Sequence, residues 1–147
     1  MATRVLIADD EALMRKALHV FVSAAPDMEV VGEAADGVAA VHLASELQPD
    51  VVLMDIQMPR LDGVEATKGV IAASPRTRVV AVTTFSSQRY VVPALRAGAS
   101  AYLVKDTEPA ALVDAIRDAL DGTCTLSPSV TSELVASVRQ APEPAPT

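Results

Sequence analysis

The sequence has 147 residues, half of them hydrophobic, and a formal net charge of −7 at pH 7. This length fits one domain with a substantial core, and the core must be mainly aliphatic because aromatic residues make up 3% of the chain. The negative charge argues against binding nucleic acid or an anionic membrane through general electrostatics. The single cysteine, Cys124, cannot form an internal disulfide, and no apolar run reaches the ~18 residues of a membrane span. We therefore expect a cytoplasmic protein.

Short apolar runs alternate with helical patterns five times along the chain. The runs predict strands at residues 5–8, 28–34, 51–54, 78–84 and 100–105. The helical patterns follow each run and end near residues 25, 47, 73, 97 and 120. This alternation predicts an α/β fold, in which a doubly wound, five-stranded parallel sheet of order 2-1-3-4-5 has helices on both faces.

The run at residues 51–54 suits a strand that is buried on both faces, and it stops at one carboxylate, Asp55. Met58-Pro59 then prevents the ladder from continuing, because proline lacks a backbone N–H. Asp62-Gly63 supplies turn chemistry and a cap for the next helix. We therefore place Asp55 at the carboxyl end of a central strand, where open α/β sheets bind their ligands.

Asp9 and Asp10 follow the first strand, which the predicted order places beside the central strand. Two carboxylates ~5 Å apart repel by roughly 3 kcal/mol at an effective dielectric near 20, so such a cluster favours a bound cation. Magnesium prefers oxygen ligands and retains waters. Asp10 and Asp55 could each offer one carboxylate oxygen, Asp9 could hold a coordinated water, and the backbone carbonyl of Gln57 could complete the protein ligands.

Two further strand ends carry polar groups, the hydroxyl of Thr83 and the ammonium of Lys105. Acids, metal, hydroxyl and ammonium together indicate phosphoryl transfer to a carboxylate, with Asp55 as the nucleophile. Lys105 would neutralise phosphoryl oxygens, and Thr83 would hydrogen-bond the product. For each residue alone there is a simpler interpretation: Asp9-Asp10 as a helix cap, and Thr83 or Lys105 as solvated strand ends.

With Met58-Pro59, Gly63 and the segment 102–105, these residues form five motifs whose order and spacing resemble the receiver domain of two-component response regulators. The resemblance covers about residues 3 to 122 and implies a flavodoxin-like receiver fold. It also implies functional roles: Asp55 as the aspartyl-phosphate site, Asp9 and Asp10 as the magnesium pair, Thr83 and Tyr102 as the switch pair, and Lys105 as the phosphate contact.

Finer motifs resemble the NarL/LuxR subfamily, including Val31-Gly32-Glu33-Ala34-Ala35-Asp36-Gly37 and Leu126-Ser127-Pro128. Regulators of that subfamily carry a C-terminal helix-turn-helix domain, which is missing from this chain. We therefore expect residues 1–122 to form the receiver and residues 123–147 to form a linker helix, starting near Ser127-Pro128, and a proline-rich tail. A truncated regulator is the favoured interpretation, and a natural stand-alone receiver is the alternative.

The predicted function is that of a switch: a sensor histidine kinase would phosphorylate Asp55 with Mg2+ and thereby change dimerisation and transcriptional output. We expect a phospho-acceptor rather than an enzyme, with at most slow autophosphatase activity, because Thr84 restricts access. We expect a homodimer on phosphorylation, promoter DNA bound only through the missing domain, and no membrane partner. The broadly apolar helix at 11–25 could be an interface with the helix at 108–120 or simply be buried.

Three alternatives differ in class. A magnesium phosphohydrolase would carry a second aspartate two residues after the nucleophile, where this chain has Gln57. A flavin-binding protein is disfavoured because Asp9-Asp10 would repel the flavin phosphate. A phosphorylation-independent scaffold would not need the acidic pair and the lysine that are intact here.

Pro93 lies where the fourth helix is expected, and a proline inside a helix costs about 3 kcal/mol. Either this helix begins late, near Val92, or it is kinked. We also predict that residues 86–92 are mobile in the unphosphorylated state.

Overall fold

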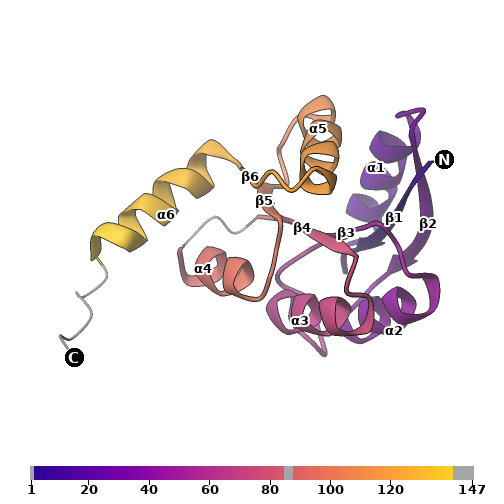
Figure 1. Cartoon of the computed structure of the whole chain (residues 1–147), viewed down its shortest axis with the longest axis horizontal. Helices are drawn as coiled ribbons and strands as arrows, with labels where there is room; N and C mark the ends of the chain where they lie inside the picture. The colour runs from indigo at the N-terminus through magenta and orange to yellow at the C-terminus, as the bar shows by residue number, and fades with distance from the viewer. Residues whose placement is uncertain (1, 85–87, 141–147) are drawn as a thin grey trace.

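The computed structural model of the chain describes residues 2–84 and 88–140. Figure 1 shows one parallel sheet with α1 and α5 on one face and α2, α3 and α4 on the other. The strands are β1 (Thr3–Ala8), β2 (Met28–Ala34), β3 (Val51–Met54), β4 (Arg78–Thr83), β5 (Ala101–Val104) and β6 (Thr125–Leu126). The helices are α1 (Ala12–Ser23), α2 (Gly37–Leu47), α3 (Gly63–Ala73), α4 (Gln88–Arg96), α5 (Pro109–Leu120) and α6 (Pro128–Gln140).

The sheet order is β2-β1-β3-β4-β5-β6, and each described neighbouring pair is parallel. The predicted parallel α/β architecture and the sequence 2-1-3-4-5 within this order are confirmed. The predicted count of five strands is wrong, because β6 adds a sixth strand beside β5. Two residues are too few to produce a periodic pattern, so no pattern in the sequence predicts this strand.

The two faces of the sheet have separate apolar cores. Leu18 and Val22 of α1 pack with Leu112 and Ile116 of α5 on one face. Alanines and valines of α2 and α3 cover the other face. All four residues of β3 are buried, as expected for the middle strand of a sheet covered on both sides. This burial fixes where β3 ends, and therefore where Asp55 lies.

Residues beyond Gly122 continue the sheet and then form α6, which packs against α4. The N–H of Ser127 donates to the Tyr102 carbonyl (3.1 Å), and the Val104 N–H donates to Ser127 Oγ (3.1 Å). Val130 of α6 is fully buried in an apolar cluster that also contains Val91 and Tyr102. The helix predicted to start at Ser127-Pro128 is confirmed, and its role as a linker stays a prediction.

Helix α4 spans Gln88–Arg96 with Pro93 inside it. Of the two predicted alternatives, the late start near Val92 is therefore wrong, and a kink at Pro93 stays a prediction. Pro93 lies in the second turn, so only one turn precedes its ring and only one intrahelical N–H is lost, the one that would bond the Arg89 carbonyl. The predicted mobility of residues 86–92 stays a prediction, and residues 86 and 87 lie outside the described residues. Across the described ranges, no helix has the length and apolar character needed to cross a membrane.

Candidate functional site: an acidic cluster at the carboxyl ends of the strands

Three strand ends bring Asp9, Asp55 and Lys105 together. Ala8 and Met54 are paired in the sheet, and the Asp55 N–H donates to the Ala8 carbonyl (2.9 Å). Asp9 and Asp55 follow these two residues, so the strand register itself places the two carboxylates side by side. Lys105 follows β5, and its N–H donates to the Thr83 carbonyl at the end of β4 (2.9 Å). The predicted convergence at one edge of the sheet is therefore observed.

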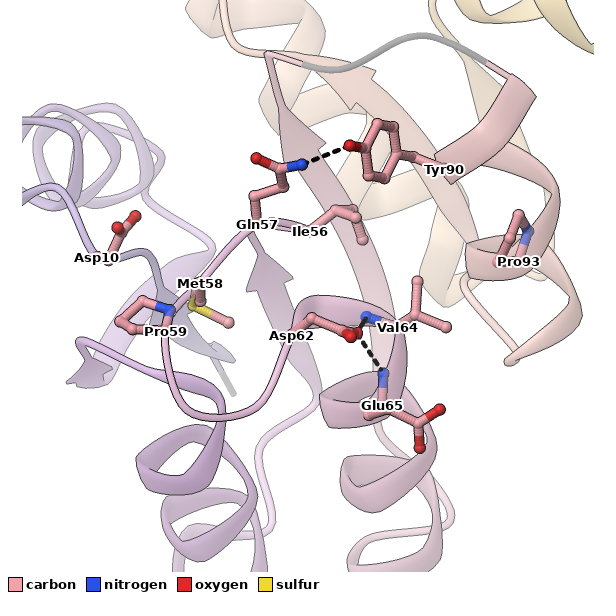
Figure 2. Close-up of a pocket in the computed structure, with 10 residues that line it drawn as sticks. All are labelled: Asp10, Ile56, Gln57, Met58, Pro59, Asp62, Val64, Glu65, Tyr90 and Pro93. Atoms are coloured by element: carbon pink, nitrogen blue, oxygen red, sulfur yellow. Dashed lines mark hydrogen bonds between the residues drawn. The ribbon is translucent and has the colours of Figure 1, made fainter.

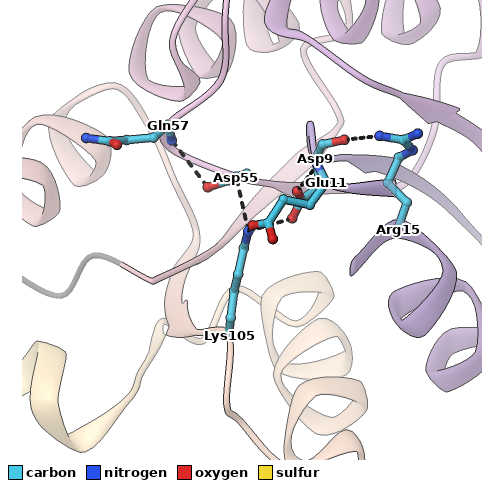
Figure 3. Close-up of polar contacts among 6 residues, drawn as sticks. All are labelled: Asp9, Glu11, Arg15, Asp55, Gln57 and Lys105. Carbon is cyan, nitrogen blue, oxygen red and sulfur yellow. Dashed lines mark hydrogen bonds and ion pairs between the residues drawn. The ribbon is translucent and has the colours of Figure 1, made fainter. Parts of the chain in front are cut away.

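The Lys105 ammonium is the centre of this cluster (Figure 3). Its Nζ lies 3.0 Å from Asp9 Oδ2, 3.1 Å from Asp55 Oδ2 and 2.8 Å from Glu11 Oε1. The side chains of Asp9, Asp55 and Lys105 are 1%, 5% and 10% exposed. One cation therefore compensates two buried carboxylates and a third, exposed one, which leaves the cluster with excess negative charge.

Burial raises the pKa of Asp55, and the charge of Asp9 raises it further, while Lys105 acts in the opposite direction. Burial lowers the pKa of Lys105, but its close contacts with the carboxylates of Glu11, Asp9 and Asp55 outweigh this effect, so the pKa is raised overall. Lys105 is therefore a permanent cation, whereas the ionised form of Asp55 is destabilised in the folded protein.

The donor set fits a hard divalent cation. One carboxylate oxygen from each of Asp9, Asp10, Glu11 and Asp55 lies within 4.8 Å of the others. Asp9 Oδ2 is buried and accepts no hydrogen bond from the described residues, although Lys105 Nζ is 3.0 Å away. Asp10 is exposed, which leaves the cluster open to water on one side. Carboxylate oxygens with access to water are the environment that Mg2+ prefers.

The loop after Asp55 is held tightly by backbone contacts. The Gln57 N–H donates to Asp55 Oδ1 (3.2 Å), and the Gly63 N–H donates to the Ile56 carbonyl (2.7 Å). A Cβ at Gly63 would collide with the backbone of Asp55 and Ile56. Asp62 caps α3 through the N–H groups of Val64 and Glu65, as the sequence predicts.

Two further predicted site residues are buried residues of the strands β4 and β5. Thr83 ends β4 and Tyr102 lies in β5, and both are fully buried. Burial raises the pKa of the Tyr102 hydroxyl, and the charge of Asp55 adds to this effect. Tyr102 is already turned inward, and its apolar cluster includes residues of α4 and α6.

Two residues that contact the site residues were not predicted from the sequence. Glu11 was interpreted as the first residue of a helix, yet it contacts Lys105, and its position directly after the acidic pair was an available signal. Tyr90 accepts a hydrogen bond from Gln57 Nε2 (2.6 Å), a contact across 33 positions that no local pattern indicates.

The sequence matches the response regulator receiver domain over residues 5–117. The chain belongs to this family. It is 41% identical to the transcriptional regulatory protein LiaR of Bacillus subtilis over 140 residues, which cover 95% of this chain and 66% of LiaR. It is 38% identical to the nitrate/nitrite response regulator protein NarL of Escherichia coli over 135 residues, covering 92% and 62%.

Solved structures agree with this membership. A two-component response regulator of the LuxR family from Aurantimonas sp. SI85-9A1 superposes with a TM-score of 0.88 at 31% identity, covering 95% of this chain and all of that one. The response regulator domain of Thermotoga maritima CheB gives 0.75 at 39% identity, covering 82% and 98%. Receiver domains are phospho-acceptors that bind Mg2+ at an acidic pocket, and the predicted relation to NarL/LuxR-type regulators is confirmed. The chain spans 63–66% of the length of three curated relatives.

Proposed function

We propose that Asp55 accepts a phosphoryl group from a sensor histidine kinase. A carboxylate oxygen of Asp55 attacks phosphorus, a P–O bond forms, and the P–N bond to the histidine of the kinase breaks. The observation that carries this proposal is the placement of Asp55: its Oδ2 lies 3.1 Å from Lys105 Nζ, and its Oδ1 accepts the Gln57 N–H. Lys105 compensates the charge that the phosphoryl group brings.

In this proposal Asp10 and Asp55 would each offer a carboxylate oxygen to Mg2+, the Gln57 carbonyl would be a further ligand, and Asp9 would hold a coordinated water. The bound ion would supply charge neutralisation at the phosphoryl oxygens. The buried Asp9 oxygen without a hydrogen bond and the close grouping of acidic oxygens support this assignment. Glu11 adds negative charge at the exposed side and holds Lys105.

Thr83 and Tyr102 form the proposed switch. The hydroxyl of Thr83 would bond a phosphoryl oxygen, and the resulting rearrangement of β4 would change the packing around Tyr102. The buried Tyr102 side chain shares an apolar cluster with Val91 of α4 and Val130 of α6. A change at Tyr102 would therefore reach both helices, and such coupling is typically worth 1–3 kcal/mol.

The outputs that we propose for a regulator containing this receiver are homodimerisation on phosphorylation and promoter binding through a helix-turn-helix domain. These proposals come from the similarity to NarL/LuxR-type regulators, which are longer than this chain. We propose slow autodephosphorylation as the only hydrolytic activity, because Thr84 restricts access to the site.

Labelling with acetyl phosphate and Mg2+ tests the acceptor. We expect one phosphoryl group per wild-type chain, measured by intact mass, and none on Asp55→Asn. Asp106→Asn is the matched control, because Asp106 is an exposed aspartate outside the acidic cluster, and it should label like the wild type. Label that persists on Asp55→Asn protein would contradict the site. A wild type that neither labels nor binds beryllofluoride would instead favour the phosphorylation-independent scaffold.

A further inference from the structure

A pocket of about 720 Å³ lies beside the proposed phosphorylation site, between the loop after β3 and helix α4 (Figure 2). Its apolar lining includes Ile56, Val64 and Pro93. One hydrogen bond crosses its edge: Gln57 Nε2 donates to the Tyr90 hydroxyl at 2.6 Å. This hydrogen bond therefore links the loop that carries the phospho-acceptor to α4 across the pocket, in addition to the apolar cluster in which Ile56 of the loop lies with Val91 and Ala94 of α4.

Gln57 is connected to the site through its backbone and to α4 through its side chain. Its N–H donates to Asp55 Oδ1, whereas its amide extends away from Asp55 and Lys105 (Figure 3). The residue is exposed, and a long exposed side chain samples several rotamers unless a partner holds it. Tyr90 is that partner, and it is itself partly buried against the apolar cluster of α4, β5 and α6.

We propose that Tyr90 is a positioning residue that keeps the Gln57 amide away from the phosphoryl group on Asp55. This inference rests on the proposed phosphorylation of Asp55. Phosphoryl oxygens are strong hydrogen-bond acceptors. Gln57 is only two positions after Asp55, so its side-chain amide could reach the phosphoryl group once it is released from Tyr90. The released NH2 group would donate to a phosphoryl oxygen and hinder the approach of water. Phosphoryl lifetime would then depend on the position of α4, because α4 carries Tyr90.

A double-mutant cycle on the whole chain tests this role through the rate at which label is lost after acetyl phosphate is removed, with Mg2+ present. Tyr90→Phe removes the acceptor hydroxyl and keeps the ring. We expect it to slow label loss roughly threefold, the size of one neutral hydrogen bond. Gln57→Ala removes the amide, keeps the backbone carbonyl proposed as a Mg2+ ligand, and gives the reference rate of label loss for a chain without the amide. The double variant should match Gln57→Ala, since the hydroxyl acts only through the amide.

A second readout needs neither metal nor phosphate. The Gln57 side-chain amide should show slower hydrogen exchange in wild-type NMR spectra than in Tyr90→Phe, while the two proteins melt at the same temperature.

The outcomes separate the two proposals. If Tyr90→Phe slows label loss equally with and without the Gln57 amide, or if all four proteins lose label at the same rate, the positioning role is overturned and the acceptor assignment stays intact. A wild type that takes no label would overturn both proposals. A Gln57 amide that exchanges equally fast in both proteins would overturn the inference alone.

Discussion

Two regions of this molecule are held together by opposite means. At the carboxyl ends of β1, β3 and β5, Lys105 balances carboxylates that have little access to water. On the α4–β5–α6 side, Val91, Tyr102 and Val130 are fully buried in an apolar cluster. The first region is stable only while its charges are compensated, and the second is stable because it excludes water.

This difference separates the region proposed to carry the phosphoryl chemistry from the region that would transmit its effect. A cation or a phosphoryl group changes the charge balance of the acidic cluster directly, whereas the apolar side can respond only by repacking. Interiors are close-packed, so a small shift at one site moves neighbouring helices between discrete arrangements. Tyr90 and Tyr102 lie where the two regions meet. Variants that damage one region while sparing the other therefore test the division.

The largest effect is expected at Gly63→Ala, in the acidic region. The new Cβ would collide with the backbone of Asp55 and Ile56, which cannot move without shifting the phospho-acceptor. We expect a loss of about 3 kcal/mol in the free energy of unfolding, measured by urea denaturation, and loss of acetyl phosphate labelling. Gly122→Ala is the control, because its Cβ meets nothing within 4 Å and only its φ of +83° is strained. It should cost about 1 kcal/mol and retain labelling.

The acidic region was largely predictable from the sequence, and the reason is topological. Buried apolar runs mark where parallel strands end, and the order 2-1-3-4-5 places those ends along one edge. The positions of Asp9, Asp55 and Lys105 follow from this alone. The contact of Glu11 with Lys105 was not predicted, because an acidic residue at a helix start and an acidic site residue have the same local sequence pattern.

The α4–β5–α6 side was predicted less well, because its structure depends on contacts between distant segments. The two-residue strand β6 exists because Ser127 bonds to the backbone at Tyr102 and Val104, more than 20 positions away. Helix α4 runs through Pro93, against the local preference, while Val91 and Ala94 are fully buried. Tertiary packing overrides propensity at such places.

Removing the cation from the acidic region should have the next largest effect. Lys105→Met keeps the aliphatic length of the side chain and leaves Asp9 and Asp55 facing each other without compensation. We expect a loss of about 2 kcal/mol in the free energy of unfolding without divalent ions, because an uncompensated buried charge is costly. Adding Mg2+ should restore part of this loss, visible as a larger rise in melting temperature than Mg2+ gives the wild type. Equal rises in both proteins would contradict the compensation argument.

On the apolar side, Val130→Asp should release α6 from α4 and β5. The expected cost is about 1.5 kcal/mol, the burial of one valine, because the helix can undock while the remaining core stays packed. Hydrogen exchange should speed up over residues 128–140, and Asp55 should still accept label. Val138→Asp is the matched control on the same helix, because Val138 is 71% exposed, and it should change neither measurement. Loss of labelling in Val130→Asp would show that the two regions are not separable.

The smallest expected effect concerns the pH dependence of Asp55. Its pKa is raised in the folded protein by burial and by the charge of Asp9. The folded state therefore binds this proton more tightly than the unfolded state, so ionisation of Asp55 reduces stability as the pH rises from the ordinary carboxyl value through the raised one. Asp55→Asn lacks this cost. In EDTA, its melting temperature should exceed that of the wild type at neutral pH, and the difference should shrink as the pH falls toward about 4. Mg2+ should reverse the order, because it stabilises only the protein that retains the carboxylate. A difference in melting temperature that grows as the pH falls would contradict the direction of the pKa shift. It would also contradict the view that the acidic cluster carries more negative charge than Lys105 compensates.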